Sequence, residues 1–358
     1  MNTAQLTSLA TAQDFPCITL ATNTHYTYPD NANEATQLKL LLKNVKEYVL
    51  ANFSKRDILS LLQHFDTIAE DLDVRNNLES IFIFLSNHTK TIVKLKQSIP
   101  KDIIQIGKGF AIKPLVKAQL LSEQYLILLL TQSVVKMYVA NDERIEEELT
   151  NTDFPLVNHA LHYTNHTTHD SRKIDVMQSA YFSLVDKAVL KWTHHYQMKC
   201  VVMGTAINFH HLLQLSEEPA MYSGHKAMNT HEASLAEIGK LAWSVMLEKQ
   251  TGKNASAMEA MQEAVGAGLV VTDIGEMYLA AKAGNVDMLI IKDDYQQFVK
   301  KQSDDTFELL SDTDAFDEKE DITNAIVWET FTKGGQLFFL SANDLFPLGN
   351  IALKKKYA

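Results

Sequence analysis

The chain has 358 residues, which is too many for one ordinary hydrophobic core and suits two or three compact units. Hydrophobic residues make up 46% and charged residues 22%, the balance of a globular rather than a disordered protein. The formal net charge of -11 argues against a surface that wraps nucleic acid throughout, so any RNA contact must use local basic patches.

No segment has the character of a membrane span or a leader. The longest purely apolar run, residues 125–130, is far shorter than the roughly 20 residues that a membrane-spanning helix needs. Residues 1–15 lack the basic start and the unbroken apolar stretch of a secretory signal, so we expect a cytoplasmic protein. Cys17 and Cys200 lie far apart, and Cys200 follows the pattern of a small buried thiol.

Residues 1–122 predict an N-terminal α/β domain. Its expected elements are a strand at 17–20, helices at 38–49 and about 55–71, and strands at 80–86 and 91–95. Lys94 and Lys96 are two residues apart and so share one strand face. They belong to a basic stretch, because residues 90–117 hold seven lysines against Asp102 alone.

Residues 123–228 predict a middle domain in which strands and helices alternate. Its expected elements are strands at 125–131 and 134–139, a helix at 177–192, a strand at 200–203 and a helix at 209–215. The first two strands are almost wholly apolar, which is typical of the centre of a sheet covered on both faces. The alternation favours an α/β layer structure.

Residues 229–358 predict a third α/β domain. Its expected elements are helices at 232–247 and 276–282, a strand at 286–291, a helix at 322–330 and a strand at 337–340. An almost purely acidic stretch, 304–321, lies within it and reads as a solvated loop.

Two segments of this third part resemble a known superfamily. Residues 279–291 are similar to a helix, turn and strand of the bacterial relatives of archaeal and eukaryotic class I release factors and Pelota. Residues 348–357 resemble the Gly-Gly-Ile-Ala-Ala-Ile-Leu-Arg-Tyr ending of Pelota-like proteins, from which Asn350 and Lys354 to Lys356 depart. The resemblance implies an RNase H-like middle domain, a C-terminal α/β/α domain like that of kink-turn-binding ribosomal proteins, and a ribosome partner.

The sequence Gly334-Gly335-Gln336 matches the motif with which release factors admit water to the peptidyl-tRNA ester. In the family that motif lies in an exposed loop of the middle domain, whereas here it leads directly into the apolar strand expected at 337–340. Two glycines before a strand are also the ordinary composition of a tight turn. We therefore expect a strand-entry turn.

The segment where the catalytic loop of the family would fall, residues 165–173, contains no glycine. It therefore gives no support for peptide release. His159, His162, His166 and His169 would share one face of a helix and could suit zinc, but a polar loop rich in histidine is more often exposed to solvent or RNA. No metal is assigned to them, although the sequence leaves that question open.

Two further kinds of metal chemistry find little support. A two-metal nuclease on an RNase H-like fold needs carboxylates on the first strands, and residues 125–139 contain neither Asp nor Glu. The acidic residues Asp312, Asp314, Asp317 and Glu318 fail the pattern of a calcium loop, because Phe316 and Asp317 stand where a ligand oxygen and a glycine are needed.

The leading hypothesis is a ribosome-binding or structured-RNA-binding protein without peptide-release catalysis and without a cofactor, acting in ribosome rescue or translation quality control. Its expected RNA-contacting residues are Lys94, Lys96, His166, His169, Arg172, Lys173, Lys354, Lys355 and Lys356. One alternative is a peptidyl-tRNA or other ester hydrolase that uses Gln336 or a histidine-bound metal. Another is a protein-interaction module that has lost RNA binding. No membrane or DNA partner is expected, and the sequence leaves the oligomeric state undetermined.

Overall fold

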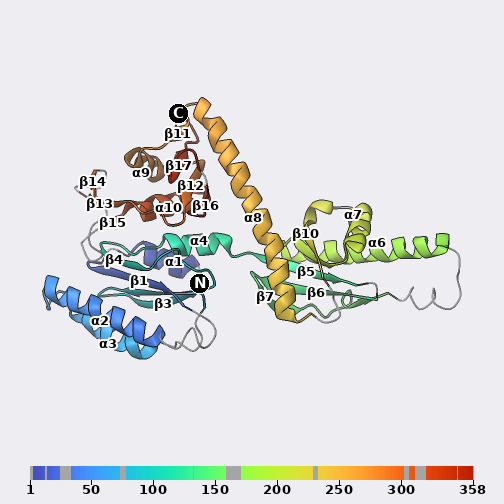
Figure 1. Ribbon diagram of the computed structural model, residues 1–358, viewed down its shortest axis with the longest axis horizontal. Coiled ribbons are helices and arrows are strands. Elements are labelled where there is room, and N and C mark those ends of the chain that lie inside the picture. The colour runs from blue at the N-terminus through green and yellow to red at the C-terminus, as the bar shows by residue number, and fades with distance from the viewer. Residues whose placement is uncertain are drawn as a thin grey trace. The chain divides into compact units, whose positions relative to one another are not determined.

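The computed structural model describes residues 3–12, 14–24, 34–72, 78–131, 133–158, 171–228, 233–301, 306–310, 320–344 and 346–357 (Figure 1). They form two compact units. Unit 1 combines Met1–Leu121 with Ser256–Ala358, and unit 2 is Ser122–Ala255. Each unit contains both sheets and helices, which confirms the expected α/β class.

The N-terminal part of unit 1 is an antiparallel sheet with the strand order β3-β2-β1-β4. Its strands are β1 (Cys17–Asn23), β2 (Ser80–Leu85), β3 (Lys90–Leu95) and β4 (Ile103–Gly107). Helices α2 (Glu34–Asn52) and α3 (Leu59–Asp71) cover one face, where the predicted Leu and Val stripe of α2 is buried (Figure 1). Helices α1 (Thr3–Ala10) and α4 (Lys113–Leu121) contribute to the core on the other face.

The C-terminal part of unit 1 is a sheet with the order β11-β17-β12-β16. These strands are β11 (Val270–Val271), β12 (Met288–Lys292), β16 (Gln336–Leu340) and β17 (Ile351–Lys354). Helices α9 (Ile274–Ala283) and α10 (Ile322–Thr332) pack on one face, and the end of α8 (Leu235–Gly266) packs on the other. The three layers confirm the expected α/β/α arrangement. A small sheet of β13 (Phe298–Lys301), β14 (Phe307–Leu309) and β15 (Glu320–Asp321) adjoins them.

One hydrophobic core joins the two parts of unit 1. Leu115 and Val116 of α4 belong to the same buried cluster as Ile322 and Ile326 of α10. Chain segments from the two ends of the sequence therefore bury apolar surface together. Unit 2 begins at Ser122, and α8 starts in unit 2 and ends in unit 1. The division of the chain into three domains, with boundaries after residues 122 and 228, stays a prediction.

Unit 2 contains a sheet with the order β10-β9-β5-β6-β7, and β8 pairs with β6. Its strands are β5 (Gln124–Leu130), β6 (Val134–Asn141), β7 (Arg144–Glu148), β8 (Leu156–Val157), β9 (Cys200–Gly204) and β10 (Tyr222–Ala227). Strands β5, β6 and β7 are antiparallel neighbours, whereas β9 and β10 run parallel to β5. A central first strand with an antiparallel pair on one side and a parallel pair on the other is the strand arrangement of an RNase H-like sheet.

Both faces of this sheet are covered, as the apolar strands predict. Leu126, Leu128 and Leu130 of β5 face a core that includes α6 (Ser171–Tyr196) and α7 (Ala206–Leu215). Tyr125 and Ile127 point to the opposite face, where the first part of α8 packs. The period of two along a strand thus divides one apolar run between two cores. None of the helices in the described ranges is both long and apolar enough to cross a membrane.

Candidate functional site

The Gly-Gly-Gln segment forms the turn between α10 and β16. Gly334 has a left-handed φ of 74°, and the Gly335 amide donates to the Thr330 carbonyl at 2.9 Å, which ends the helix. The Gln336 amide then donates to the Asp287 carbonyl at 2.9 Å and begins the strand. The structure confirms the expected strand-entry turn.

Crowding explains why glycine occupies position 335. A Cβ atom there would lie 2.7 Å from Cγ2 of Thr330 and 3.0 Å from the carbonyl oxygen of Val286. The space beside Gly334 is open, so the left-handed backbone is the reason for glycine at that position. Both glycines therefore have a structural reason within the fold.

The predicted RNA-contacting residues of the middle domain lie at or beyond the limits of the described chain. His166 and His169 fall in 159–170, outside the described residues, together with His159 and His162. Arg172 and Lys173 belong to the first turn of α6, and their side chains lie outside the described set. The RNA contacts of His166, His169, Arg172 and Lys173 stay predictions. The acidic residues at 312, 314, 317 and 318 are likewise outside the described ranges.

Each of the three C-terminal lysines has a partner within unit 1. The Lys354 ammonium lies 2.8 Å from Oδ2 of Asp287, and that of Lys355 lies 2.7 Å from Oε1 of Glu276. The Lys356 ammonium donates to the carbonyl of Gly284 at 3.2 Å. Surface ion pairs of this kind contribute only about 0–1 kcal/mol. These lysines could exchange their partners for phosphates at little cost.

The chain end is joined to the segment between α9 and β12. Oδ1 of Asn285 accepts hydrogen bonds from the amides of Lys356 and Tyr357 at 3.0 and 3.2 Å. The side-chain nitrogen Nδ2 of Asn285 in turn donates to the Tyr357 carbonyl at 3.1 Å. The two segments that carry the sequence resemblance, 279–291 and 348–357, therefore contact each other.

Lys94 lies on β3, an edge strand of the N-terminal sheet, and Lys96 lies just after it; both are half-buried. The C-terminal lysines belong to β17 and the residues that follow it, in a different sheet. The predicted basic residues thus come from separate elements of unit 1. Their role in RNA binding stays a prediction.

The centre of the unit 2 sheet offers no carboxylate for nuclease chemistry. Strands β5 and β9 are adjacent and parallel, and their side chains are buried and apolar apart from Gln124 at the edge. A two-metal site would need acidic side chains converging there. Within the described ranges, no group of three or more His, Cys, Asp or Glu side chains is arranged to hold a metal ion.

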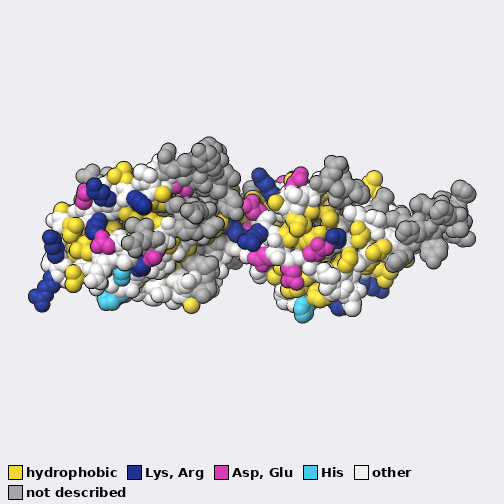
Figure 2. All heavy atoms as spheres, turned by 90° about the horizontal axis from the view of Figure 1, so that it is seen from below, with side chains coloured by type: hydrophobic (Ala, Val, Ile, Leu, Met, Phe, Trp, Pro, Cys, Tyr) yellow, Lys and Arg dark blue, Asp and Glu magenta, His cyan; other side chains and the backbone are white. Residues whose placement is uncertain are grey.

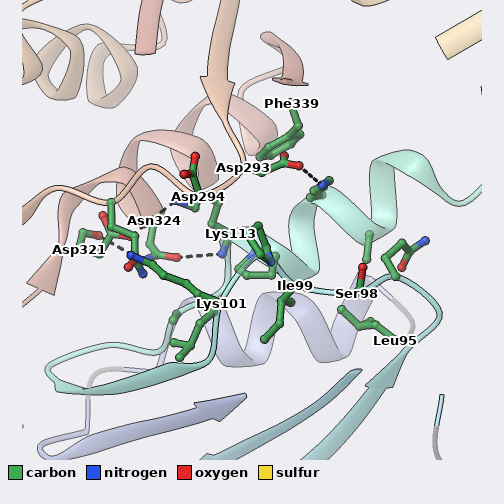
Figure 3. A pocket seen from close by; sticks show the side chains of 18 residues that line it. Leu95, Ser98, Ile99, Lys101, Lys113, Asp293, Asp294, Asp321, Asn324 and Phe339 are labelled. Carbon is green, nitrogen blue, oxygen red and sulfur yellow. Dashed lines mark hydrogen bonds and ion pairs between the residues drawn. The ribbon is translucent and has the colours of Figure 1, made fainter. Parts of the chain in front are cut away.

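Unit 1 contains a small pocket between its N-terminal and C-terminal parts, with a cavity of about 40 Å³ (Figure 3). Its lining combines apolar residues such as Ile99 and Phe339 with charged ones before β4, on α4, between β12 and β13, and at the end of β15. Space of this size holds a few water molecules rather than an organic ligand. The pocket is better suited to polar packing than to binding a substrate.

Lys113 is the central charge of this pocket and is only 5% exposed. Its ammonium donates to Oγ1 of Thr323 at 3.1 Å and to the Tyr295 carbonyl, and it lies 3.8 Å from Oδ2 of Asp321. Its backbone amide donates to Oδ1 of Asn324 at 2.9 Å. Figure 3 shows this side chain directed from α4 toward the start of α10.

The electrostatics of the pocket are those of a buried ion pair. Burial lowers the pKa of Lys113, and the carboxylates of Asp321 and Asp293 oppose that shift. Oδ1 of Asp321 accepts from the amide and hydroxyl of Thr323, at 3.0 and 2.7 Å. A second pair, Lys117 with Asp293 at 2.6 Å, lies beside the first. Together the two pairs join α4 to the C-terminal part of unit 1.

Sequence reasoning did not single out Lys113. The local signal was an isolated lysine in an apolar stretch, because Phe110, Ile112, Leu115 and Val116 around it are all buried. That pattern indicates burial of the side chain but not its partners, which are about two hundred residues further along the chain.

Comparison with known proteins yields one family. Residues 124–285 match the model of bacterial archaeo-eukaryotic release factor family 3. This range covers nearly all of unit 2 together with α8 and α9. A search of curated proteins finds no match to the chain.

Several solved structures are similar at low identity. Archaeoglobus fulgidus Pelota is 13% identical over 77% of this chain and 79% of its own, with a TM-score of 0.35. An archaeal translation termination factor, aRF1, is 11% identical over 99% and 96%, with a TM-score of 0.23. S. cerevisiae Dom34, described as a translation termination-like factor involved in RNA quality control pathways and interacting with Hbs1, is 13% identical over 78% and 74%, with a TM-score of 0.36.

The family match begins in unit 2, where the sheet has an RNase H-like strand order, and extends to the helix and turn that carried the sequence resemblance. It confirms that the chain is similar to the bacterial relatives of the archaeal and eukaryotic release factors.

Proposed function

We propose that this protein is a release-factor-like translation factor that binds the ribosome through RNA contacts and does not itself catalyse peptide release. The observation that carries the proposal is the family match over residues 124–285. A ribosome partner would place the protein in the cytoplasm. The proposed RNA-contacting residues remain Lys94, Lys96, His166, His169, Arg172, Lys173, Lys354, Lys355 and Lys356.

The lack of catalysis is supported by the place of the Gly-Gly-Gln segment. Gln336 begins a strand that pairs in register with Met288, and the two preceding glycines are needed for the turn. An ester-positioning loop must instead present its side chain to a substrate held nearby. The role proposed for the chain is therefore recognition of a ribosome state, as in rescue or quality control of translation.

Co-sedimentation of the full chain with purified bacterial ribosomes through a sucrose cushion tests the binding part of the proposal. We expect the protein in the ribosomal pellet at about 50 mM salt and its progressive loss as salt rises, because phosphate contacts release counterions. The chain centrifuged without ribosomes is the control. Absence from the pellet at low salt would overturn the proposed function.

A peptidyl-tRNA hydrolysis assay on ribosomal complexes tests the catalytic part. We expect the wild-type chain and Gln336→Ala to show the same background rate. Hydrolysis by the wild type that Gln336→Ala abolishes, with thermal stability unchanged, would establish an enzyme instead.

A further inference from the structure

Three lysines and a serine of unit 2 lie close together, and none of them is among the RNA-contacting residues proposed above. Lys199 directly precedes β9, Ser223 belongs to β10, and Lys249 and Lys253 are one turn apart on α8. We call these four residues the Lys249 cluster. The Lys249 ammonium donates to Oγ of Ser223 at 3.1 Å. Lys199 and Lys253 are exposed, and Lys249 is half-buried.

Local packing brings these residues together. Strands β9 and β10 are parallel, and Tyr222 pairs with Cys200, so Ser223 and Lys199 lie at the same end of neighbouring strands. Helix α8 approaches β10 closely because residue 224 is glycine, where a Cβ atom would lie 2.6 Å from Cγ1 of Val245. Lys249 follows Val245 by one helical turn and is thereby held over Ser223.

The cluster concentrates positive charge. Burial lowers the pKa of Lys249, and the neighbouring ammonium groups of Lys199 and Lys253 lower it further, while the carboxylate of Glu123 opposes them. Within the part of the chain that the structure describes, neither Lys199 nor Lys253 takes part in an ion pair, in contrast to Lys354 and Lys355. The charged groups that act on Lys249 are thus two ammonium groups and one carboxylate, and a bound anion would offset this excess of positive charge.

We infer that the Lys249 cluster binds backbone phosphates of RNA, an inference that rests on the proposed function and adds a site to it. Lysine is a point-charge binder of phosphate. The Ser223 hydroxyl accepts from Lys249 and keeps its own hydrogen to donate to a phosphate oxygen. The lysines come from two separate elements, so they can contact successive phosphates of one RNA strand. A ligand with a single carboxylate could contact only part of the cluster.

The first test compares two double variants of the full chain. Lys199→Gln with Lys253→Gln removes two exposed charges of the cluster, and Lys187→Gln with Lys240→Gln removes two exposed charges elsewhere in unit 2. The probe is a fluorescently labelled poly(U) RNA of about 20 nucleotides, and the readout is anisotropy over a salt series. Each phosphate contact to a single strand contributes about -0.7 to the slope of log affinity against log salt.

We expect the cluster variant to bind at least about tenfold more weakly at about 50 mM salt, with a slope flatter by about 1.4. The control variant should behave as the wild type. Equal affinity and slope for the two variants would overturn the inference. Circular dichroism and thermal melting confirm that both variants fold.

The second test needs no variant. A lysine with a lowered pKa reacts faster with acylating reagents, so Lys249 should be modified early at about pH 8 and protected when poly(U) is bound. Mass spectrometry of the digested protein measures both. Unchanged modification in the presence of RNA, or equal protection by poly-glutamate, would contradict an RNA phosphate site.

These results separate the cluster from the proposed function. Loss of poly(U) binding in the cluster variant, without any co-sedimentation of the wild type with ribosomes, would retain the phosphate site and reject the ribosome partner. Normal co-sedimentation with unaltered poly(U) binding in the cluster variant would reject the site alone.

Discussion

Lys113 is held by partners that leave its charge little access to water. Its replacement by alanine would leave Asp321 buried without a cation, and such uncompensated charges cost about 3–5 kcal/mol. We expect Lys113→Ala to unfold unit 1 at lower urea concentration, seen as faster hydrogen exchange of α10 amides. The double variant Lys113→Met with Asp321→Asn should recover part of the loss. Equal exchange in Lys113→Ala and the wild type would contradict this role.

The same lysine gives a prediction for pH. Because its pKa is lower in the folded protein than the ordinary 10.5, the unfolded chain binds more protons between those two values. Its charge therefore costs stability at low pH, and this cost is lost as pH rises toward 10.5. The wild type should gain stability relative to Lys113→Met as the pH rises toward 10.5 in urea titrations. A constant difference across that range would exclude the effect.

At the Gly-Gly-Gln turn, neighbouring residues should respond in opposite ways. Gly335→Ala forces a Cβ against Thr330 and the Val286 carbonyl and should cost about 1–3 kcal/mol of unfolding free energy. Gln336→Ala changes an exposed side chain and should leave stability within about 0.5 kcal/mol. Thermal melting of both variants is the measurement. Equal melting temperatures would argue against the structural explanation for Gly335.

Helix α8 is positioned by close contact at one of its glycines. A Cβ at residue 239 would lie 2.1 Å from the carbonyl oxygen of Glu143, which is backbone and cannot rotate away. Gly239→Ala should therefore displace the helix and destabilise unit 2 by about 2 kcal/mol or more. Gly252 provides the matched control on the same helix, because nothing lies within 4 Å of its added Cβ.

Gly252→Ala should stabilise the protein by up to about 1 kcal/mol, since alanine is the better helix former. Hydrogen exchange in β10 and α8 measures both substitutions. If both glycine variants had the same effect, the close packing of α8 at Gly239 would not determine its position.

Among the elements, apolar strands were the most predictable. The runs expected at 125–131, 134–139 and 337–340 correspond to β5, β6 and β16, because covering both faces of a strand leaves a nearly continuous apolar signal. Strand β10 was missed, since Ser223-Gly224-His225 reads as an interruption although Gly224 serves close packing against α8.

Helix α8 is longer than the helix that the apolar pattern predicts. The expected helix at 232–247 is the first half of α8, which continues to Gly266. Ala242 and Val245 face the core of unit 2, whereas Ala257 and Met261 face the C-terminal sheet of unit 1. A helix that changes its buried face loses a single periodic stripe, so its second half gives no clear amphipathic signal.

A candidate site could be predicted from the sequence where its residues are adjacent in the chain, but not where they come from distant segments. The Gly334-Gly335 turn could be predicted because both glycines and the following strand are adjacent in sequence. The partners of Lys113 and of Lys249 come from distant segments, and only the folded chain brings them together. Basic residues counted along the sequence also do not reveal which are already paired, as Lys354 and Lys355 are.

At the scale of the molecule, the chain carries a formal net charge of -11. On the face drawn in Figure 2, Lys and Arg side chains are scattered among acidic and apolar ones and form no broad basic area. Binding to RNA would then depend on a few local groups of lysines. Lysines with and without an ion-pair partner should differ in how much they contribute to RNA affinity.

The C-terminal lysines allow that difference to be measured on the whole protein. Reversal of Lys354, Lys355 and Lys356 to Glu would set new carboxylates against Asp287 and Glu276, so loss of binding could reflect disturbed folding. Glutamine removes the charge without this repulsion. We expect the triple glutamine variant to reduce ribosome co-sedimentation and to flatten its salt dependence, by at most about 0.9 per lysine.

Because each paired lysine must exchange its partner for a phosphate, the loss per residue should be smaller than for Lys199 and Lys253, which form no ion pair with any residue that the structure describes. Thermal melting of the triple variant controls for stability, because the ion pairs of Lys354 and Lys355 are only partly exposed and their loss can lower the melting temperature. Co-sedimentation that stays unchanged across the salt series would show that the chain end is held for structure alone, with its lysines turned to Asp287 and Glu276 in the bound protein as in the free one.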